Sequence, residues 1–180
     1  MGNDLKDVRD RTLLLIGFAG GFRRSELVGL DSEDVEQVAQ GLVVNLRRSK
    51  TDQCGIGRQV AIPFGHSEWC PVQSLSEWLR LSKISAGALF RRVDRHGHML
   101  ERLCGEAVSL IIKARTAAAG LSPDEYSGHS LRAGFATSAA QAGLTPWDIR
   151  RQTGHASYSI LATYVRQREL FANHPISALL

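Results

Sequence analysis

The chain has 180 residues, of which 43% are hydrophobic and 22% are charged, and these values are typical of one globular domain. Its net charge of +4 is compatible with a polyanionic partner but is too small to identify one. The best apolar run, residues 13–18, is far too short to cross a bilayer and lacks the basic flank of a secretory signal. We therefore expect a cytosolic protein that makes no membrane contact.

The first part of the chain predicts two helices and then a sheet. Asp4 is a candidate N-cap for a helix over residues 5–18. The core-facing candidates of this helix are Leu13, Leu14 and Ile16. Two glycines at residues 20–21 end it, and a short helix follows over residues 25–28.

The segment after these helices predicts strands. Residues 42–46 and 58–62 have strand composition, and residues 34–38 form a weaker candidate. A polar, glycine-containing turn at residues 49–57 separates the first two. The simplest arrangement is a three-stranded antiparallel sheet with Lys50 at a hairpin tip.

The remainder of the chain is mainly helical. Pro71 opens a predicted helix over residues 72–81, residues 88–90 form a short buried stretch, and the polar residues 91–102 predict a loop. Further helices are predicted at residues 105–118, 129–141, 146–152, 158–166 and 176–180. These elements predict a mostly α-helical α+β fold with a small three-stranded antiparallel sheet, without internal repeats.

Three separated motifs in the last third carry side chains suited to chemistry on a phosphodiester. His129 and Arg132 stand three apart, so one helical turn places them on one face. Gly154-His155 follows, and Tyr164 comes nine residues later. Each has a plainer interpretation, namely a helix cap with a surface charge, a buried hydrogen-bonded histidine and a core tyrosine. The small residues at 133–140 favour a closely packed helix that directs the first pair into a cleft.

Together, His129-Ser130-Leu131-Arg132, Gly154-His155 and Tyr164 resemble the C-terminal signature of tyrosine recombinases, the phage integrase family. Residues 21–27, Gly-Phe-Arg-Arg-Ser-Glu-Leu, resemble the first arginine motif of that family, in a register that selects Arg23 rather than Arg24. Lys50 matches the position of the family's catalytic lysine. The resemblance extends over residues 13–164 and implies the tyrosine-recombinase catalytic fold. It also implies that residues 1–180 are a single catalytic domain without the N-terminal core-DNA-binding domain.

The resemblance implies a site-specific recombinase that cleaves and rejoins DNA by transesterification, with Tyr164 forming a 3′-phosphotyrosyl intermediate. Arg23 and Arg132 would present forked donors to the non-bridging oxygens, and His155 would donate a further hydrogen bond. His129 is suited to accept the proton of the tyrosine or to order the site. Lys50 is the candidate acid for the departing 5′ oxygen.

Supporting residues and cofactors follow from the same chemistry. Glu26 is a candidate to orient Lys50 or His129, although a surface charge on its helix is an equal alternative. We expect no metal or other cofactor, because arginines replace cations, no Asp/Glu cluster is present, and the cysteines lack Cys-x-x-Cys spacing.

The expected partners are double-stranded DNA and other recombinase subunits in a synaptic tetramer. The apolar tail, residues 171–180, would dock on a neighbouring subunit or fold back on its own core. Candidates for DNA backbone contact are the basic residues Arg47, Arg48, Arg58, Arg91, Arg92, Arg150 and Arg151. A non-cleaving DNA-binding module of the same fold and a type IB topoisomerase are the alternative functions. The expected location is the cytoplasm of a bacterium, with the nucleoid, in a chain of bacterial or phage origin.

Overall fold

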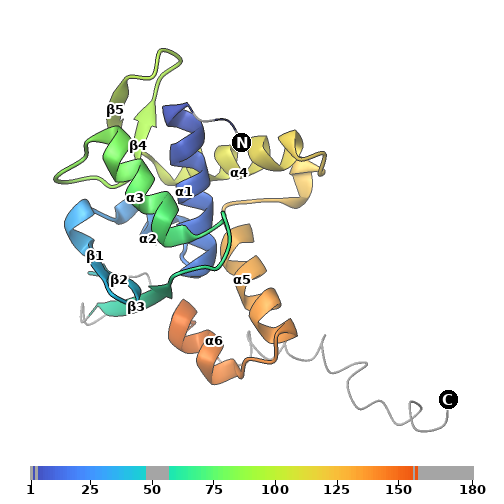
Figure 1. Cartoon of the computed structure of the whole chain (residues 1–180). Coiled ribbons are helices and arrows are strands. Elements are labelled where there is room, and N and C mark those ends of the chain that lie inside the picture. Colours follow the sequence, from blue (N-terminus) through green and yellow to red (C-terminus); the bar gives the residue numbers. More distant parts are fainter. Residues whose placement is uncertain (1, 3, 48–56, 156, 158–180) are drawn as a thin grey trace, which may run out of the picture.

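The computed structural model describes residues 2, 4–47, 57–155 and 157 of the chain (Figure 1). Several predictions lie outside the described residues: those for Arg48, Lys50 and Tyr164, for the helices at 158–166 and 176–180, and for the tail. The described helices are mostly those that the sequence predicts, and none of them is long and apolar enough to span a membrane.

Helix α1 (Leu5–Ala19) runs through the middle of the molecule (Figure 1). Asp4 caps it, as predicted, by accepting a hydrogen bond of 2.7 Å from the backbone N–H of Asp7. Helix α3 (Pro71–Ser82) packs along α1, and its fully buried Trp78 donates from Nε1 to the carbonyl of Leu89 at 2.9 Å. This indole therefore satisfies its buried N–H while it anchors the stretch at residues 88–90.

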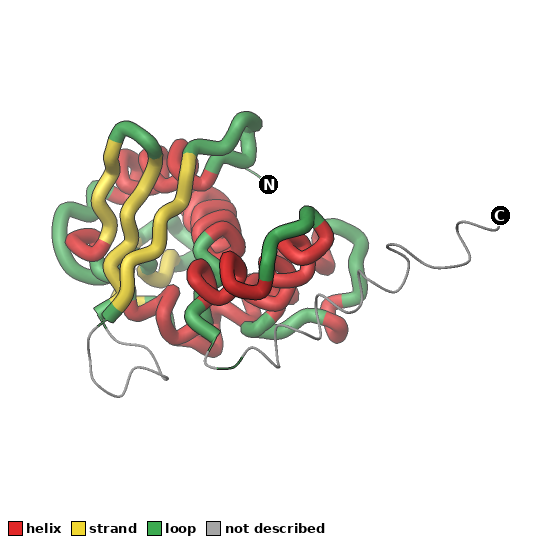
Figure 2. The backbone as a smooth tube through the Cα atoms, turned by 90° about the horizontal axis from the view of Figure 1, so that it is seen from below, coloured by secondary structure: helices red, strands yellow, loops and turns green. Residues whose placement is uncertain are grey.

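The predicted three-stranded antiparallel sheet is confirmed (Figure 2). Strand β2 (Gly41–Leu46) pairs with β1 (Val35–Val38) on one side and with β3 (Arg58–Pro63) on the other. Alternate residues form one buried face, made by Leu42, Val44, Leu46, Val60 and Ile62. The β2–β3 register pairs Leu46 with Arg58, which places Arg58 at the end of the sheet where residues 47–57 leave and return.

The predicted loop over residues 91–102 is wrong, because this segment forms a two-stranded hairpin of β4 (Arg91–Val93) and β5 (Met99–Arg102). Its strands are short, polar and largely exposed, so the sequence shows no apolar alternation to reveal them. The carboxylate of Asp94 holds the turn by accepting from the backbone N–H groups of His96 and His98 at 2.8 and 2.9 Å.

The remaining elements bring the chain back to α1. Helix α2 (Arg24–Gly29) and a 3-10 turn (Ser32–Asp34) precede the sheet. Helix α4 (Gly105–Ala118) leads through a second 3-10 turn (Pro123–Glu125) to α5 (Ser130–Gln141), which packs on α1.

The last described helix is α6 (Pro146–Thr153), which lies between α5 and the sheet (Figure 1). The predicted Thr145 cap is confirmed, since its side chain accepts from the N–H of Asp148. Helices α5 and α6 share a small core separate from the main one, formed by Ala136, Ala139, Ala140 and Ile149. The three alanines of α5 let Ile149 of α6 pack closely, and this contact holds α6 against α5.

Candidate active site

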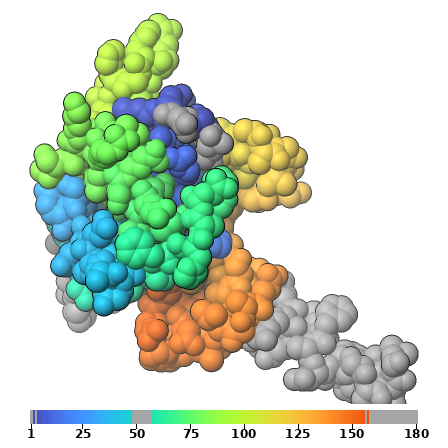
Figure 3. Space-filling model, viewed as in Figure 1, coloured from blue at the N-terminus to red at the C-terminus, as the bar shows by residue number. Residues whose placement is uncertain are grey.

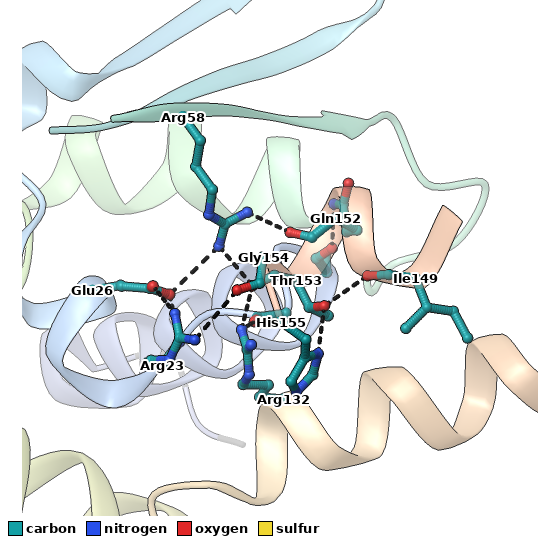
Figure 4. Close-up of polar contacts among 11 residues, drawn as sticks. Arg23, Glu26, Arg58, Arg132, Ile149, Gln152, Thr153, Gly154 and His155 are labelled. Atoms are coloured by element: carbon teal, nitrogen blue, oxygen red, sulfur yellow. Dashed lines mark hydrogen bonds and ion pairs between the residues drawn. The ribbon is translucent and has the colours of Figure 1, made fainter. Parts of the chain in front are cut away.

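The carbonyl groups at the C-terminal end of α6 are the point where distant parts of the chain meet (Figure 4). A helix leaves its last carbonyls without intrahelical partners, and here arginine side chains bind them. Arg58, on β3, donates from Nη1 to the carbonyl of Gln152 at 2.6 Å and from Nη2 to that of Thr153 at 3.0 Å. Cations at this position also complement the negative end of the helix dipole.

Two further arginines bind the same turn. Arg132 donates from Nη1 to the carbonyls of Thr153 and Gly21, and Arg23 donates from Nη2 to the carbonyl of Gly154 at 3.3 Å. Arg132 is buried, with 5% of its surface exposed. The structure therefore brings together the two predicted catalytic arginines, which are 109 residues apart in the sequence by their numbers.

Gly154 makes this convergence sterically possible. It ends α6 in the left-handed conformation, with φ of 66°, which glycine adopts at little cost. A Cβ atom at this position would lie 2.8 Å from Nε of Arg58. The glycine before His155 thus serves both the helix end and the close approach of an arginine.

Glu26 is the buried carboxylate of the cluster, with 1% of its side chain exposed. It accepts from the backbone N–H of Arg23 at 2.8 Å and from Nη1 of the same residue at 2.6 Å, and it lies 3.6 Å from Nη2 of Arg58. The alternative that Glu26 is a surface charge is wrong. Within the described residues its partners are Arg23 and Arg58 and not the predicted His129, whereas the other predicted partner, Lys50, lies outside the described residues.

We define the arginine cluster as Arg23, Arg58 and Arg132. Its total positive charge is larger than the negative charge of Glu26. Among the described residues, three guanidinium groups face one carboxylate, so this part of the site carries a net positive charge and is electrostatically complementary to an anion such as a phosphodiester. Burial lowers the pKa of Arg58, and the charge of Glu26 opposes that shift. An arginine remains protonated at neutral pH in either case.

His155 lies half-buried beside the arginine cluster. Its Nδ1 lies 2.7 Å from Oγ1 of Thr153, and its carbonyl accepts from Nε of Arg150 at 2.9 Å. Burial, reinforced by the charges of Arg132, Arg23 and Arg58, lowers the pKa of His155 to about 4. The imidazole is therefore neutral at pH 7 in the absence of a bound anion.

The lowered pKa of His155 predicts that acid destabilises the fold. The ordinary pKa of histidine is about 6.5, so between pH 6.5 and 4 the unfolded chain binds a proton that the folded chain does not. The stabilising contribution is complete above pH 6.5 and is lost as the pH falls towards 4. Urea unfolding across this range should show a smaller loss of stability in His155→Gln than in the original chain.

A matched control for this experiment is His66→Gln, because His66 is exposed, lies in the loop between β3 and α3, and is not part of the arginine cluster. This variant should retain the original dependence of stability on pH. Identical pH dependence in all three proteins would contradict the burial of a neutral imidazole at residue 155.

The predicted pair His129 and Arg132 separates in the structure. His129 is the exposed N-cap residue of α5, and its backbone N–H donates to Oγ of Ser127 at 3.3 Å. Arg132, one turn later, is directed inwards to Gly21 and Thr153. In the described part of the chain, the His129 ring takes part in none of the contacts that join the cluster.

Arg58 was predicted only as a DNA backbone contact, but the structure places it in the site. A signal for this placement was present in the sequence, because Arg58, Val60 and Ile62 alternate on one face of β3 and the two apolar residues are buried. A residue on that face at the end of the strand had to point towards the core side of the sheet.

The other predicted DNA contacts lie in different places. Arg150 and Arg151 are on α6, and the guanidinium of Arg151 lies over the ring of Trp147, 5.2 Å from its centroid. Arg47 forms ion pairs with Asp34 at 2.6 Å and Asp31 at 3.6 Å, next to the end of the sheet. Arg91 and Arg92 are on the β4–β5 hairpin, at the other end of the molecule from α6 (Figure 1).

Lys50 and Tyr164 lie outside the described residues. The segment that contains Lys50 joins two paired strand ends, Leu46 and Arg58, and the second of these belongs to the arginine cluster. Among the residues that the structure describes, no group of three or more His, Cys, Asp or Glu side chains is arranged to hold a metal ion.

Comparison with known proteins shows similarity over almost the whole chain. An integrase/recombinase XerD homologue of Selenomonas ruminantium is 40% identical over 177 residues, which cover 97% of this chain and 52% of that protein. The tyrosine recombinase XerD of Corynebacterium glutamicum is 31% identical over 163 residues, which cover 88% of this chain and 48% of that protein. The chain thus spans about half the length of these relatives.

Solved structures show the same fold. The crystal structure of XerA recombinase matches with a TM-score of 0.71 and 24% identity, over 94% of this chain and 57% of that chain. A XerH site-specific recombinase bound to palindromic difH substrate, in a post-cleavage complex, matches with a TM-score of 0.71 and 22% identity, over 94% of this chain and 45% of that chain. These matches confirm the predicted tyrosine-recombinase catalytic fold. Residues 2–170 also match the phage integrase family as a whole, and the chain therefore belongs to the phage integrase family.

Proposed function

We propose that this chain is the catalytic domain of a site-specific tyrosine recombinase, which cleaves and rejoins DNA strands through a 3′-phosphotyrosyl intermediate. The observation that carries the proposal is the convergence of Arg23, Arg132 and His155 on the C-terminal end of α6, with Arg58 and Glu26 between them. The family membership of residues 2–170 supports the same conclusion.

The chemistry assigned to the cluster is stabilisation of a phosphorane-like transition state. Attack on phosphorus builds negative charge on two non-bridging oxygens, and preorganised guanidinium groups bind that charge without further reorganisation. Arg23 has five N–H donors in its side chain, and its contacts with Glu26 and Gly154 use two of them among the described residues. Donors therefore remain for a phosphate. Glu26 keeps the fork of Arg23 in place before DNA arrives.

The remaining roles rest on the family resemblance. Tyr164 would attack phosphorus, Lys50 would protonate the departing 5′ oxygen, and His129 would accept the phenolic proton or order the site. His129 is exposed in the described structure, so in this proposal it completes the site only when DNA and residues beyond 157 lie against it. Because the phosphotyrosyl bond retains the energy of the phosphodiester, a second 5′ hydroxyl can reverse the reaction and exchange strands.

The nucleophile is tested by trapping the covalent adduct. A DNA duplex that carries the target site and a nick near the cleavage position should accumulate an adduct with the original protein, and Tyr164→Phe should abolish it. The chain has two other tyrosines, so Tyr126→Phe and Tyr158→Phe are matched controls that should retain adduct formation. An adduct that survives Tyr164→Phe overturns the assignment, and no adduct with any variant or the original supports a non-cleaving DNA-binding module.

We also propose double-stranded DNA and further subunits as partners. The similar XerH structure is bound to its difH substrate, which supports DNA. Arg47, Arg150 and Arg151 would contact the phosphate backbone near the site, and Arg91 and Arg92 would do so only where DNA or a partner reaches the hairpin. Arg48, which lies outside the described residues, remains a proposed backbone contact. The cytoplasm, with the nucleoid, remains the proposed location.

The tail, residues 171–180, is proposed to dock on a neighbouring subunit. An open apolar groove of about 770 Å³ supports this, because it would accept apolar tail residues such as Phe171 and Ile176. On the face shown in Figure 3, it lies between the teal segment after β3 and the orange α5–α6 pair. Its rim includes the exposed apolar side chains Phe18, Phe64, Trp69 and Leu144.

Removal of residues 169–180 should therefore weaken assembly on DNA and leave the fold intact, because the apolar contact between subunits is lost. Trp69→Ala, on the receiving side of the groove, should have the same effect. Electrophoretic mobility shifts with increasing protein concentration would measure assembly, and circular dichroism would check the fold. Unchanged assembly in both variants would count against this proposal.

A further inference from the structure

The side chain of Thr153 links the end of α6 to the imidazole of His155 (Figure 4). Thr153 is fully buried, and its Oγ1 lies 2.7 Å from the carbonyl oxygen of Ile149 and 2.7 Å from Nδ1 of His155. Both distances are those of good hydrogen bonds. The hydroxyl therefore lies between a carbonyl oxygen, which can only accept a hydrogen bond, and a ring nitrogen, which can donate or accept one.

The number of protons decides the direction of these two bonds. A threonine hydroxyl has one proton to donate and can accept others. The carbonyl of Ile149 has none, so that bond exists only if the hydroxyl donates to it. The bond to His155 then requires Nδ1–H to donate to Oγ1. A neutral imidazole has one N–H, so Nε2 carries a lone pair.

The orientation of the hydroxyl is fixed by the rest of the Thr153 residue. Its carbonyl is bound by Arg58 and Arg132, which holds the backbone. Its γ-methyl packs on Gly21, where φ is +58° and a Cβ would lie only 2.8 Å from Cγ2 of Thr153. With the methyl held against the turn before Arg23, the hydroxyl is directed towards Ile149 and His155.

We propose that Thr153 is a positioning residue that holds His155 in the Nδ1–H tautomer, so that Nε2 is a proton acceptor in the DNA-free protein. The tautomer itself is independent of the proposed function, whereas its consequence for catalysis rests on it. The charged groups that face this ring are Arg132 from α5, Arg23 before α2 and Arg58 from β3, with Glu26 behind the last two.

The consequence is that His155 does not donate to a phosphate oxygen until it takes up a proton. A phosphodiester bound among the arginines offsets their charge and raises the pKa of the imidazole. A proton from solvent then adds to the lone pair of Nε2, and the resulting imidazolium donates from Nδ1 to Thr153 and from Nε2 to the phosphate. The donor role predicted from the family pattern would thus be acquired on DNA binding.

The test is long-range ¹H–¹⁵N correlation NMR of the 180-residue chain, labelled at its six histidines and recorded near pH 7 without DNA. The signal of His155 is identified as the one missing in His155→Gln. We expect it to show the Nδ1–H pattern, to lose that pattern in Thr153→Val, which replaces the hydroxyl by a methyl of similar size, and to regain it in Thr153→Ser.

Thr116→Val is the matched control, because the hydroxyl of Thr116 also donates to a carbonyl four residues earlier, that of Ile112 at 3.0 Å, but lies on α4. It should leave the His155 signal unchanged. An Nε2–H pattern in the original chain, or an Nδ1–H pattern that persists in Thr153→Val, would overturn the proposal. If Thr153→Val does not fold, Thr153→Ser provides the test. Serine keeps the hydroxyl, so a folded Thr153→Ser variant must show the Nδ1–H pattern, and loss of that pattern would overturn the proposal. Because no DNA is present, these outcomes are independent of whether Tyr164 forms an adduct.

Discussion

Replacing Arg132 with alanine is expected to lower the free energy of unfolding by about 3 kcal/mol, because hydrogen bonds to charged groups contribute roughly 1.5–3 kcal/mol. The carbonyl of Gly21 loses its Arg132 donor, and the carbonyl of Thr153 keeps only Arg58 of its two arginine donors. These carbonyls, of Gly21 and Thr153, belong to the turn before Arg23 and to the end of α6. Arg132 thus joins three segments at one guanidinium. Denaturant unfolding followed by circular dichroism measures the loss.

Arg132→Lys separates charge from geometry. A lysine retains the positive charge but presents a compact ammonium rather than a planar fork, so it cannot reproduce the contacts of Arg132. We expect intermediate stability and a loss of DNA cleavage of about 100-fold or more, the scale seen when one preorganised donor to a developing oxyanion is removed.

Arg92→Ala is the matched control for the stability of both variants. Arg92 pairs with Glu101 on the exposed face of the β4–β5 hairpin, and exposed ion pairs contribute about 0–1 kcal/mol. Its removal should change stability little. If Arg132→Ala were no less stable than Arg92→Ala, the buried contacts of Arg132 would not hold the three segments together.

Elements with strong local signals were predictable from the sequence. The helix predicted at residues 105–118 has these bounds in the structure, and the Thr145 cap and the three strands are where composition and turn residues place them. Each of these features depends on residues that are neighbours in the sequence. A cap residue accepts a hydrogen bond from a free N–H group of the helix that follows it, and the residues of a turn are those that favour its backbone conformation. The hairpin over residues 91–102 was missed because its polar strands lack such a signal.

The site was predictable only in part, because some of its features also lack a local signal in the sequence. The residues were recognisable as a set, but the burial of Glu26 and the partners of Arg58 depend on contacts with segments far away in the sequence. Arg58 donates to the carbonyl of Gln152, which is 94 residues away in the sequence, and no local sequence pattern predicts such a contact. Alternation along β3 gives the direction of the side chain, whereas only the packing of α6 against the sheet supplies its partners.

The arginine cluster has one further implication for the order of events on DNA. In the DNA-free protein, the three guanidinium groups already bind the carbonyls of residues 152–154, so their positions are set before a phosphate arrives. Such preorganisation is what makes electrostatic stabilisation effective, because little energy is spent on reorientation during the reaction. The cost is a concentration of positive charge, which only one buried carboxylate offsets in the described residues.

Replacing that carboxylate, in Glu26→Gln, is expected to lower the free energy of unfolding by about 3–5 kcal/mol, the usual effect of removing one partner of a buried ion pair. Glutamine has nearly the same shape but no charge, so Arg23 loses its counter-charge at 2.6 Å and Arg58 loses the one at 3.6 Å. The three arginines then repel one another without compensation. Thermal unfolding monitored by circular dichroism measures the effect.

An added anion should reverse much of this loss. Sulfate can occupy the position among the arginines, and a ligand that binds only the folded state at 100 times its dissociation constant stabilises it by about 2.7 kcal/mol. We therefore expect sulfate to raise the unfolding temperature of Glu26→Gln more than that of the original chain. Glu77→Gln is the matched control, because Glu77 pairs with Arg11 on the α1–α3 surface outside the cluster. Its response to sulfate should equal that of the original chain, and an equal response in Glu26→Gln would show that Glu26 does not balance the charge of the site.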